Sequence, residues 1–98
     1  MLFAIFTQDA PGSEDARKTH HDAHIAHFKA HKEQIALAGP LSEESGASAG
    51  SLVVFSADTL ADAKAFIEAD PFHPAGVWSD IRITALKASI HNADLFTS

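Results

Sequence analysis

Histidine is the residue type with the most chemical potential in this sequence. Five of the seven histidines lie between His20 and His31. At 100° per residue, four of these imidazoles fall within an arc of about 60° on one helical face. They are His20, His24, His27 and His31. Imidazoles four residues apart on a helix can bind zinc or copper. No carboxylate shares the arc, so we predict no resident metal or other cofactor, and a solvated stripe remains the alternative.

Two residues of the same segment have chemistry that needs no metal. An imidazole such as His24 transfers protons in both directions near neutral pH, which suits a general acid or base. Arg17 lies seven residues earlier and therefore on nearly the same helical face. Its guanidinium can clamp a carboxylate or phenolate. A surface ion pair with an acidic residue is the alternative, and the sequence leaves both open.

Four strands are expected to position these residues. Short apolar runs bounded by turn residues predict the strands at 2–7, 35–41, 51–57 and 77–86. The second of these contains Gly39-Pro40, which favours an edge or a bend. The polar stretch 42–51 is expected to form a loop, whereas residues 88–98 give no clear signal.

Two helices are expected between the strands. Ser13 is a plausible N-cap for the first, which is expected to run to about Gln34. Its predicted apolar stripe consists of Ile25, Phe28, Ile35 and Ala36. Thr59 and Asp62 resemble a capping box that opens the second helix, and Pro71 prevents that helix from continuing.

The resulting order, βαββαβ, predicts an α+β, ferredoxin-like fold with a four-stranded antiparallel sheet and two helices on one face. The strands do not alternate between apolar and polar residues. Leu52 and Val54 share one face of their strand, while Val53 and Phe55 share the other. Two helices cover only one face of a sheet. The other face must meet another partner, most simply a second copy of the chain, although the sequence does not tell which face that is.

Composition limits the classes of function. The 98 residues carry 13 acidic and seven basic side chains, for a net charge of −6. An acidic chain without basic clusters argues against nucleic acid and anionic membranes as partners. The first residues lack a signal-peptide pattern, and no apolar run approaches the roughly 20 residues of a membrane span. We therefore expect a cytoplasmic protein. The absence of cysteine excludes disulfides and thiolate chemistry.

Several motifs resemble the YciI-like (YCII-related) family when they are taken in order. Arg17 and the segment 24–28 (HIAHF) are similar to its arginine and His-Leu-Ala-x-Leu pattern. Further similar segments are Ala38-Gly39-Pro40-Leu41, Gly50-Ser51-Leu52, Ala69-Asp70-Pro71-Phe72 and Ala75-Gly76-Val77. The resemblance covers about residues 1–87, which we interpret as the YciI-like domain, with residues 88–98 as its C-terminal extension.

The resemblance implies a fold, a site and a class of reaction. The fold is a dimeric α+β barrel in which two sheets face each other. The family's proposed His–Asp pair corresponds to His24 and Asp70, and one type of relative removes chloride from a chlorinated hydroxyquinol. We therefore expect a lyase, isomerase or hydrolase that uses His24 and Asp70 on a cyclic or aromatic compound. The small-molecule substrate would be bound by Arg17, Ser51 and His21.

Some positions depart from the family pattern, and other functions stay open. Relatives often have arginine where this chain has His21, and an aromatic residue after a proline where it has Ala85-Leu86. Trp78 is expected at the dimer interface or, alternatively, against an aromatic substrate. One alternative function is a non-enzymatic ligand- or metal-binding module that uses the histidine-rich helix. Another is a regulatory domain with a vestigial pocket.

Overall fold

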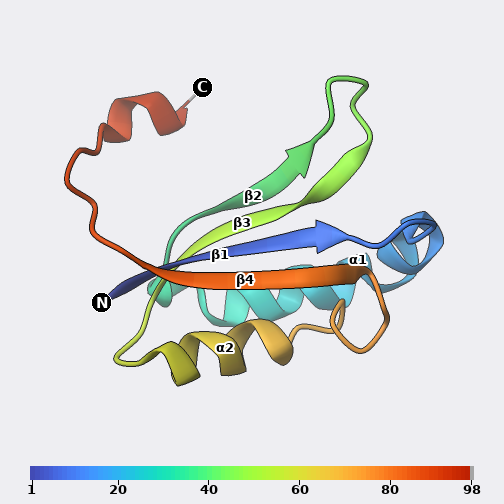
Figure 1. Ribbon diagram of the computed structural model, residues 1–98, viewed down its shortest axis with the longest axis horizontal. Helices are drawn as coiled ribbons and strands as arrows, with labels where there is room; N and C mark the ends of the chain where they lie inside the picture. The colour runs from blue at the N-terminus through green and yellow to red at the C-terminus, as the bar shows by residue number, and fades with distance from the viewer. Residues whose placement is uncertain (98) are drawn as a thin grey trace.

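The computed structural model describes residues 1–97, which form a four-stranded sheet with two helices on one side (Figure 1). The elements in chain order are β1 (Leu2–Asp9), α1 (Glu14–Ala30), β2 (Ile35–Ser42), β3 (Ser48–Ser56), α2 (Leu60–Glu68) and β4 (Trp78–Leu86). Short 3₁₀ turns follow α1 at Lys32–Gln34 (η1) and β4 at Ala93–Thr97 (η2). All neighbouring strands are antiparallel, in the order β2-β3-β1-β4. The predicted ferredoxin-like α+β fold is confirmed.

Two predicted boundaries are wrong, and one predicted capping contact is absent. The first helix ends at Ala30, and Ile35 and Ala36 belong to β2, where Ile35 pairs with Phe55. The strand was predicted to begin at residue 35, so only the assignment of these two residues to the helical stripe is wrong. The predicted polar loop is shorter, because β3 begins at Ser48 and leaves a tight hairpin over 43–47. The first helix begins at Glu14 with Ser13 as its N-cap residue, as predicted, but the Ser13 side chain makes no capping hydrogen bond. The carbonyl of Ser13 accepts a hydrogen bond from the Arg17 amide.

The start of the second helix is as predicted. The hydroxyl of Thr59 accepts a hydrogen bond from the Asp62 amide at 3.1 Å, so Thr59 is a true N-cap. The helix ends at Glu68, with Ala69 as its C-cap, shortly before Pro71. Neither α1 nor α2, nor either short turn in the described part of the chain, has the length and hydropathy that a membrane crossing requires.

The core lies between the helices and one face of the sheet. Phe3 and Ile5 of β1 pair with Phe55 and Val53 of β3, and all four side chains point towards the helices. Phe66 of α2 stacks on Phe55 with ring centroids 4.1 Å apart. These residues are at most 5% exposed, which is typical of a close-packed interior. The core therefore holds α2, and the residues that follow it, firmly against the sheet.

Neither α1 nor α2 covers the opposite face of the sheet. We call it the open face, and its apolar members are Leu2, Ala4, Phe6, Leu37, Leu41, Leu52, Val54 and Leu86. Phe6 and Leu86 are 42% and 40% exposed. The prediction of a sheet that is apolar on both sides is confirmed, and the structure assigns Val54 to the open face and Val53 to the core.

Trp78 does not lie at an exposed interface. It is only 9% exposed and belongs to the core beneath the sheet. Its ring meets the ring of Phe72 edge-on, with centroids 5.8 Å apart. The expectation of an interface role is therefore wrong, because the first residue of β4 turns its side chain towards the helices.

Candidate active site

A cavity of about 230 Å³ lies between α1 and the β2–β3 half of the sheet. It is lined by Arg17, His21, His24, Ile25, Phe28, Ala38, Gly39, Pro40 and Ser51. Four of the five predicted site residues thus meet in one cavity, and the fifth, Asp70, lies directly behind His24. A cavity of about 150 Å³ is enough for benzene. The space therefore suits one substituted ring.

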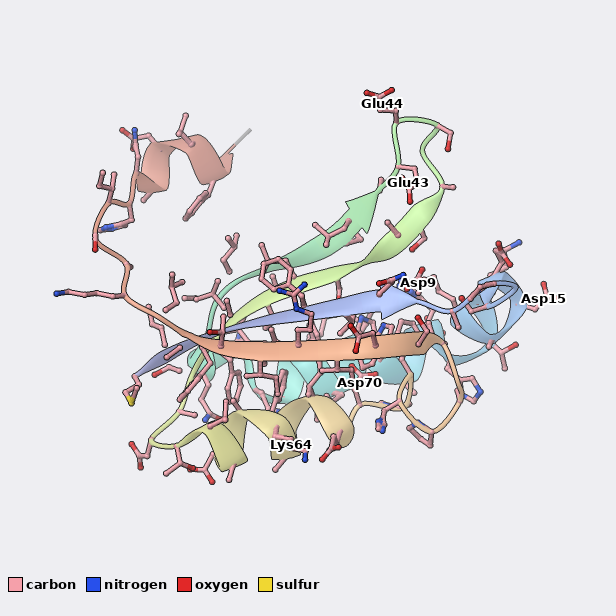
Figure 2. All side chains as sticks on the ribbon, in the orientation of Figure 1. Asp9, Asp15, Glu43, Glu44, Lys64 and Asp70 are labelled. Atoms are coloured by element: carbon pink, nitrogen blue, oxygen red, sulfur yellow. The ribbon has the colours of Figure 1, made fainter. Side chains whose placement is uncertain are left out.

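His24 and Asp70 form the centre of the site. Nδ1 of His24 lies 2.6 Å from Oδ2 of Asp70, and the two side chains are 11% and 0% exposed. The other carboxylate oxygen, Oδ1, accepts a hydrogen bond from the Phe72 amide at 2.8 Å. Figure 2 shows Asp70 on the helix side of the sheet, beyond the end of α2. Both oxygens of Asp70 are thus engaged, which fixes the direction of the carboxylate.

The local sequence explains why Asp70 is held so well. Pro71 ends α2 because it has no amide hydrogen to donate to the helix. The chain then turns, and an aspartate that bonds the amide two residues later stabilises such a turn. With a carboxylate accepting at both oxygens, Nδ1 of His24 donates, and the lone pair of the neutral imidazole is at Nε2. Nε2 is therefore the nitrogen available to a ligand.

Aromatic rings hold the imidazole in place. The ring of Phe72 stacks on His24 with centroids 4.1 Å apart and planes 7° apart. Phe28, one helical turn after His24, lies 4.5 Å from it on a tilted plane. Trp78 meets His24 edge-on at 6.4 Å. An imidazole with one nitrogen bonded and its ring packed against neighbours has little rotational freedom, as acid–base chemistry requires.

Arg17 forms an ion pair and also lines the cavity. Its Nη2 and Nε donate to the two oxygens of Asp9 at 2.7 and 3.2 Å. Asp9 also accepts a 2.6 Å hydrogen bond from the hydroxyl of Ser48, at the start of β3. The guanidinium lies 5.0 Å from the centre of the Phe72 ring. Arg17 was expected either to bind an anionic substrate group or to form an ion pair, and the structure shows the ion pair. Nη1 of Arg17 takes no part in that pair.

Ser51 and His21 complete the predicted set. Ser51 is buried, and its hydroxyl shares a 2.6 Å hydrogen bond with that of Thr7 on the neighbouring strand. Gly50 makes this approach feasible, because its φ is +151° and a Cβ there would collide with the carbonyl of Thr7. His21 is exposed at the rim of the cavity. It is the only one of the five predicted residues with an exposed side chain.

Three imidazoles of the histidine stripe, those of His24, His27 and His31, contact the rest of the protein. Nε2 of His27 donates to the carbonyl of Phe66 at 2.8 Å, and Nδ1 of His31 donates to the carbonyl of His27 at 2.9 Å. Both imidazoles line a larger hollow of about 520 Å³ between α1 and α2, away from His24. Among residues 1–97, no three histidine or carboxylate side chains are grouped as a metal site requires. The stripe thus ties α1 to α2.

Three residues of the site were not predicted from the sequence. Asp9 orients Arg17, Thr7 bonds Ser51, and Phe72 packs on His24. Asp9 ends a strand just before Pro11-Gly12, and an acidic residue at that point could have been matched with Arg17 across the turn. Thr7 and Phe72 depend on strand register and loop path, for which one sequence has no direct signal.

The fold and the site define a class of protein. It is a ferredoxin-like α+β domain with a buried carboxylate–imidazole pair beside a small cavity, and residues 1–87 match the YCII-related domain. The chain belongs to the YCII-related family. It is 33% identical to Protein YciI of Escherichia coli O6:H1 over 95 residues, or 89% of this chain and 97% of that protein. An uncharacterized protein of Haemophilus influenzae is 30% identical over the same shares of both chains.

A solved structure is similar over most of the chain. It is the 5-chloro-2-hydroxyhydroquinone dehydrochlorinase TftG of Burkholderia phenoliruptrix, in complex with 2,5-dihydroxybenzoquinone. The TM-score is 0.80 at 29% sequence identity, covering 89% of this chain and 94% of that one. The similarity therefore extends to nearly the whole of both folds.

Proposed function

We propose that this chain is a small-molecule enzyme that uses His24 and Asp70 for acid–base chemistry on a cyclic or aromatic compound. The reaction class is that of a lyase, isomerase or hydrolase. The observation that carries the proposal is the 2.6 Å contact between Nδ1 of His24 and a fully buried carboxylate, at the wall of a cavity sized for one ring. Such a pair directs the second imidazole nitrogen towards a ligand.

The geometry supports a division of roles. Asp70 holds the tautomer of His24 and stabilises the imidazolium that forms when Nε2 takes a proton. An acidic hydroxyl on a ring is a suitable proton donor, since it leaves a charge that the ring delocalises. Arg17, with Nη1 free of its ion pair, and His21 at the rim are placed to stabilise an anionic oxygen. Ser51 offers a hydroxyl whose orientation Thr7 sets.

Dehydrochlorination is the best-supported specific reaction of this class. The similar enzyme TftG is named for it and binds a dihydroxybenzoquinone, a single six-membered ring with oxygen substituents. Loss of HCl needs a base for the proton, while chloride leaves with the electron pair of its bond to carbon. A neutral His24 supplies such a base, and the reaction needs no oxidant. We infer that the substrate is a hydroxylated ring with a leaving group.

A turnover assay with a matched histidine control tests this function. The protein is incubated with chlorinated and unchlorinated di- and trihydroxybenzenes, and chloride release and ring absorbance are followed. We expect His24→Asn to lower turnover about 10²–10⁴-fold, which is the usual contribution of general acid–base catalysis. His20→Asn, on the same helix but outside the cavity lining, should leave it unchanged. Full turnover by His24→Asn would contradict the assignment, as would the absence of both turnover and quinone binding.

We further propose that the protein is a homodimer in which two open faces meet. An apolar sheet face on each of two identical chains can pair about a twofold axis. Phe6→Asp tests this proposal. Phe6 is 42% exposed, so the new charge would not be buried within its own protomer. It should produce a folded monomer by sedimentation velocity. Leu60→Asp, at a residue 52% exposed on the helix side, is the control that should remain dimeric. A monomeric wild type at micromolar concentration would contradict the proposal.

A further inference from the structure

The C-terminal segment, residues 88–97, exposes large apolar side chains. Ile90 is 94% exposed, Leu95 71% and Phe96 58%. The segment lies beyond the residues that match the YCII-related domain, and its only regular structure is the short turn η2. It has no core of its own, and three such side chains in ten residues are costly to leave in water. The segment therefore needs a surface to cover.

The segment runs along the side of the sheet that lacks helices. In Figure 1 it leaves the end of β4 and turns away from α2. A groove of about 620 Å³ separates it from the open face. One wall consists of Leu2, Leu37 and Val54 from the sheet, and the other includes Ile90 and Phe96 from the segment. The sheet wall is apolar, whereas the wall from the segment also contains Lys87, Ser89 and His91. The protomer does not close the gap between them.

The exposed area of the chain agrees with a missing partner. The chain of 10.4 kDa exposes 6517 Å². A folded monomer of this mass is expected to expose about 5,400 Å², so the excess is roughly 1,100 Å². A stable interface buries about 800 Å² per partner. The excess is thus large enough for one interface made of the open face together with the C-terminal segment.

We propose that the C-terminal segment of each protomer packs against the open face of a second copy of this chain, which buries Ile90, Leu95 and Phe96 between the two. This inference rests on the proposed homodimer and adds to it a second contact, made by residues outside the family domain. A second copy is the occupant that the structure favours, because the chain carries both complementary apolar surfaces. By twofold symmetry, the same contact forms twice in each dimer.

Thiol labelling tests the position of the segment directly. The chain has no cysteine, so Phe96→Cys introduces a single thiol. We expect this thiol to react slowly above the dimer dissociation constant and at least tenfold faster below it. Leu60→Cys, at a residue of similar exposure on the helix side, should react at the same rate at all concentrations. Protection of Phe96→Cys that does not depend on concentration would show that the segment packs on its own protomer, which overturns the proposal.

A double substitution measures the contribution of the segment to association. Leu95→Ser with Phe96→Ser removes two apolar side chains from each protomer and, since both are exposed, should leave the fold intact by circular dichroism. We expect dimer dissociation to become roughly a hundredfold or more easier by sedimentation. If the variant and the wild type are dimers with the same dissociation constant, the proposed role of the segment is refuted, but the homodimer is not. A wild type that never dimerises would refute the homodimer as well.

Discussion

The Asp70→Asn variant isolates the contribution of one negative charge to the candidate active site. The carboxylate is fully buried and accepts hydrogen bonds from Nδ1 of His24 and from the amide of Phe72. Asparagine has nearly the same shape but only one oxygen acceptor. If that oxygen keeps the Phe72 amide, the NH₂ group faces His24 and favours the tautomer whose lone pair is at Nδ1. Nε2 would then carry a proton and could not act as a base.

The magnitudes follow from these contacts. Loss of the general base should lower turnover about 10²–10⁴-fold. Hydrogen bonds to charged groups contribute about 1.5–3 kcal/mol each, and asparagine retains one in a weaker form. We therefore expect the free energy of unfolding to fall by about 1–3 kcal/mol. In a domain of this size, each kcal/mol lowers the melting temperature by about 4–8 °C.

Three measurements on the same variant separate these effects. Turnover reports the chemistry, thermal unfolding by circular dichroism reports stability, and ¹⁵N chemical shifts of the histidine ring report which nitrogen carries the proton. Asp58→Asn, at an exposed aspartate before α2, is the control and should change none of the three. Wild-type turnover by Asp70→Asn, with Nδ1 of His24 still protonated, would refute the reasoning.

Two further substitutions test how the cavity is held together. Asp9→Asn should lower the free energy of unfolding by about 1–3 kcal/mol in denaturant titrations, because Arg17 loses its charged partner. Ser48→Ala should cost only about 1 kcal/mol, because its hydrogen bond to Asp9 is exposed to solvent. Equal losses would contradict the assigned role of the ion pair. Gly50→Ala should lower the melting temperature more than Gly46→Ala does. Both glycines have positive φ, but only at Gly50 would a Cβ also meet a neighbouring backbone. A smaller effect at Gly50 would contradict that account.

Local signals explain which parts of the fold were predictable. The N-cap at Thr59 and the helix end before Pro71 depend on residues a few positions apart, and both are present as predicted. The end of α1 was not predictable in this way. Ile35 fits a helical stripe as well as a strand, and its pairing with Phe55, twenty residues later, decides for the strand. The type of each element could therefore be predicted from the sequence, whereas the end of α1 depended on the contact between Ile35 and Phe55.

The residues of the candidate site likewise fall into those that sequence motifs predicted and those that depend on tertiary contacts. Motif order brought His24 and Asp70 together, and the structure places them 2.6 Å apart. Asp9 and Phe72 were missed, since their contacts with Arg17 and His24 arise from the path of a turn and a loop. The histidine stripe was seen correctly as one helical face. Its direction, towards the carbonyl of Phe66 rather than towards solvent, is set by how α1 packs beside α2.

The sequence by itself determined the order of the elements, the two apolar sides of the sheet and the residue types available for proton transfer. These properties follow from periodicity and composition, which do not depend on distant contacts. Only the tertiary structure decided that Val54 lies on the open face and Trp78 in the core, because strand register and helix placement select one of two equivalent sides. It also decided that Arg17 is paired with Asp9, since β1 and α1 meet there only after folding.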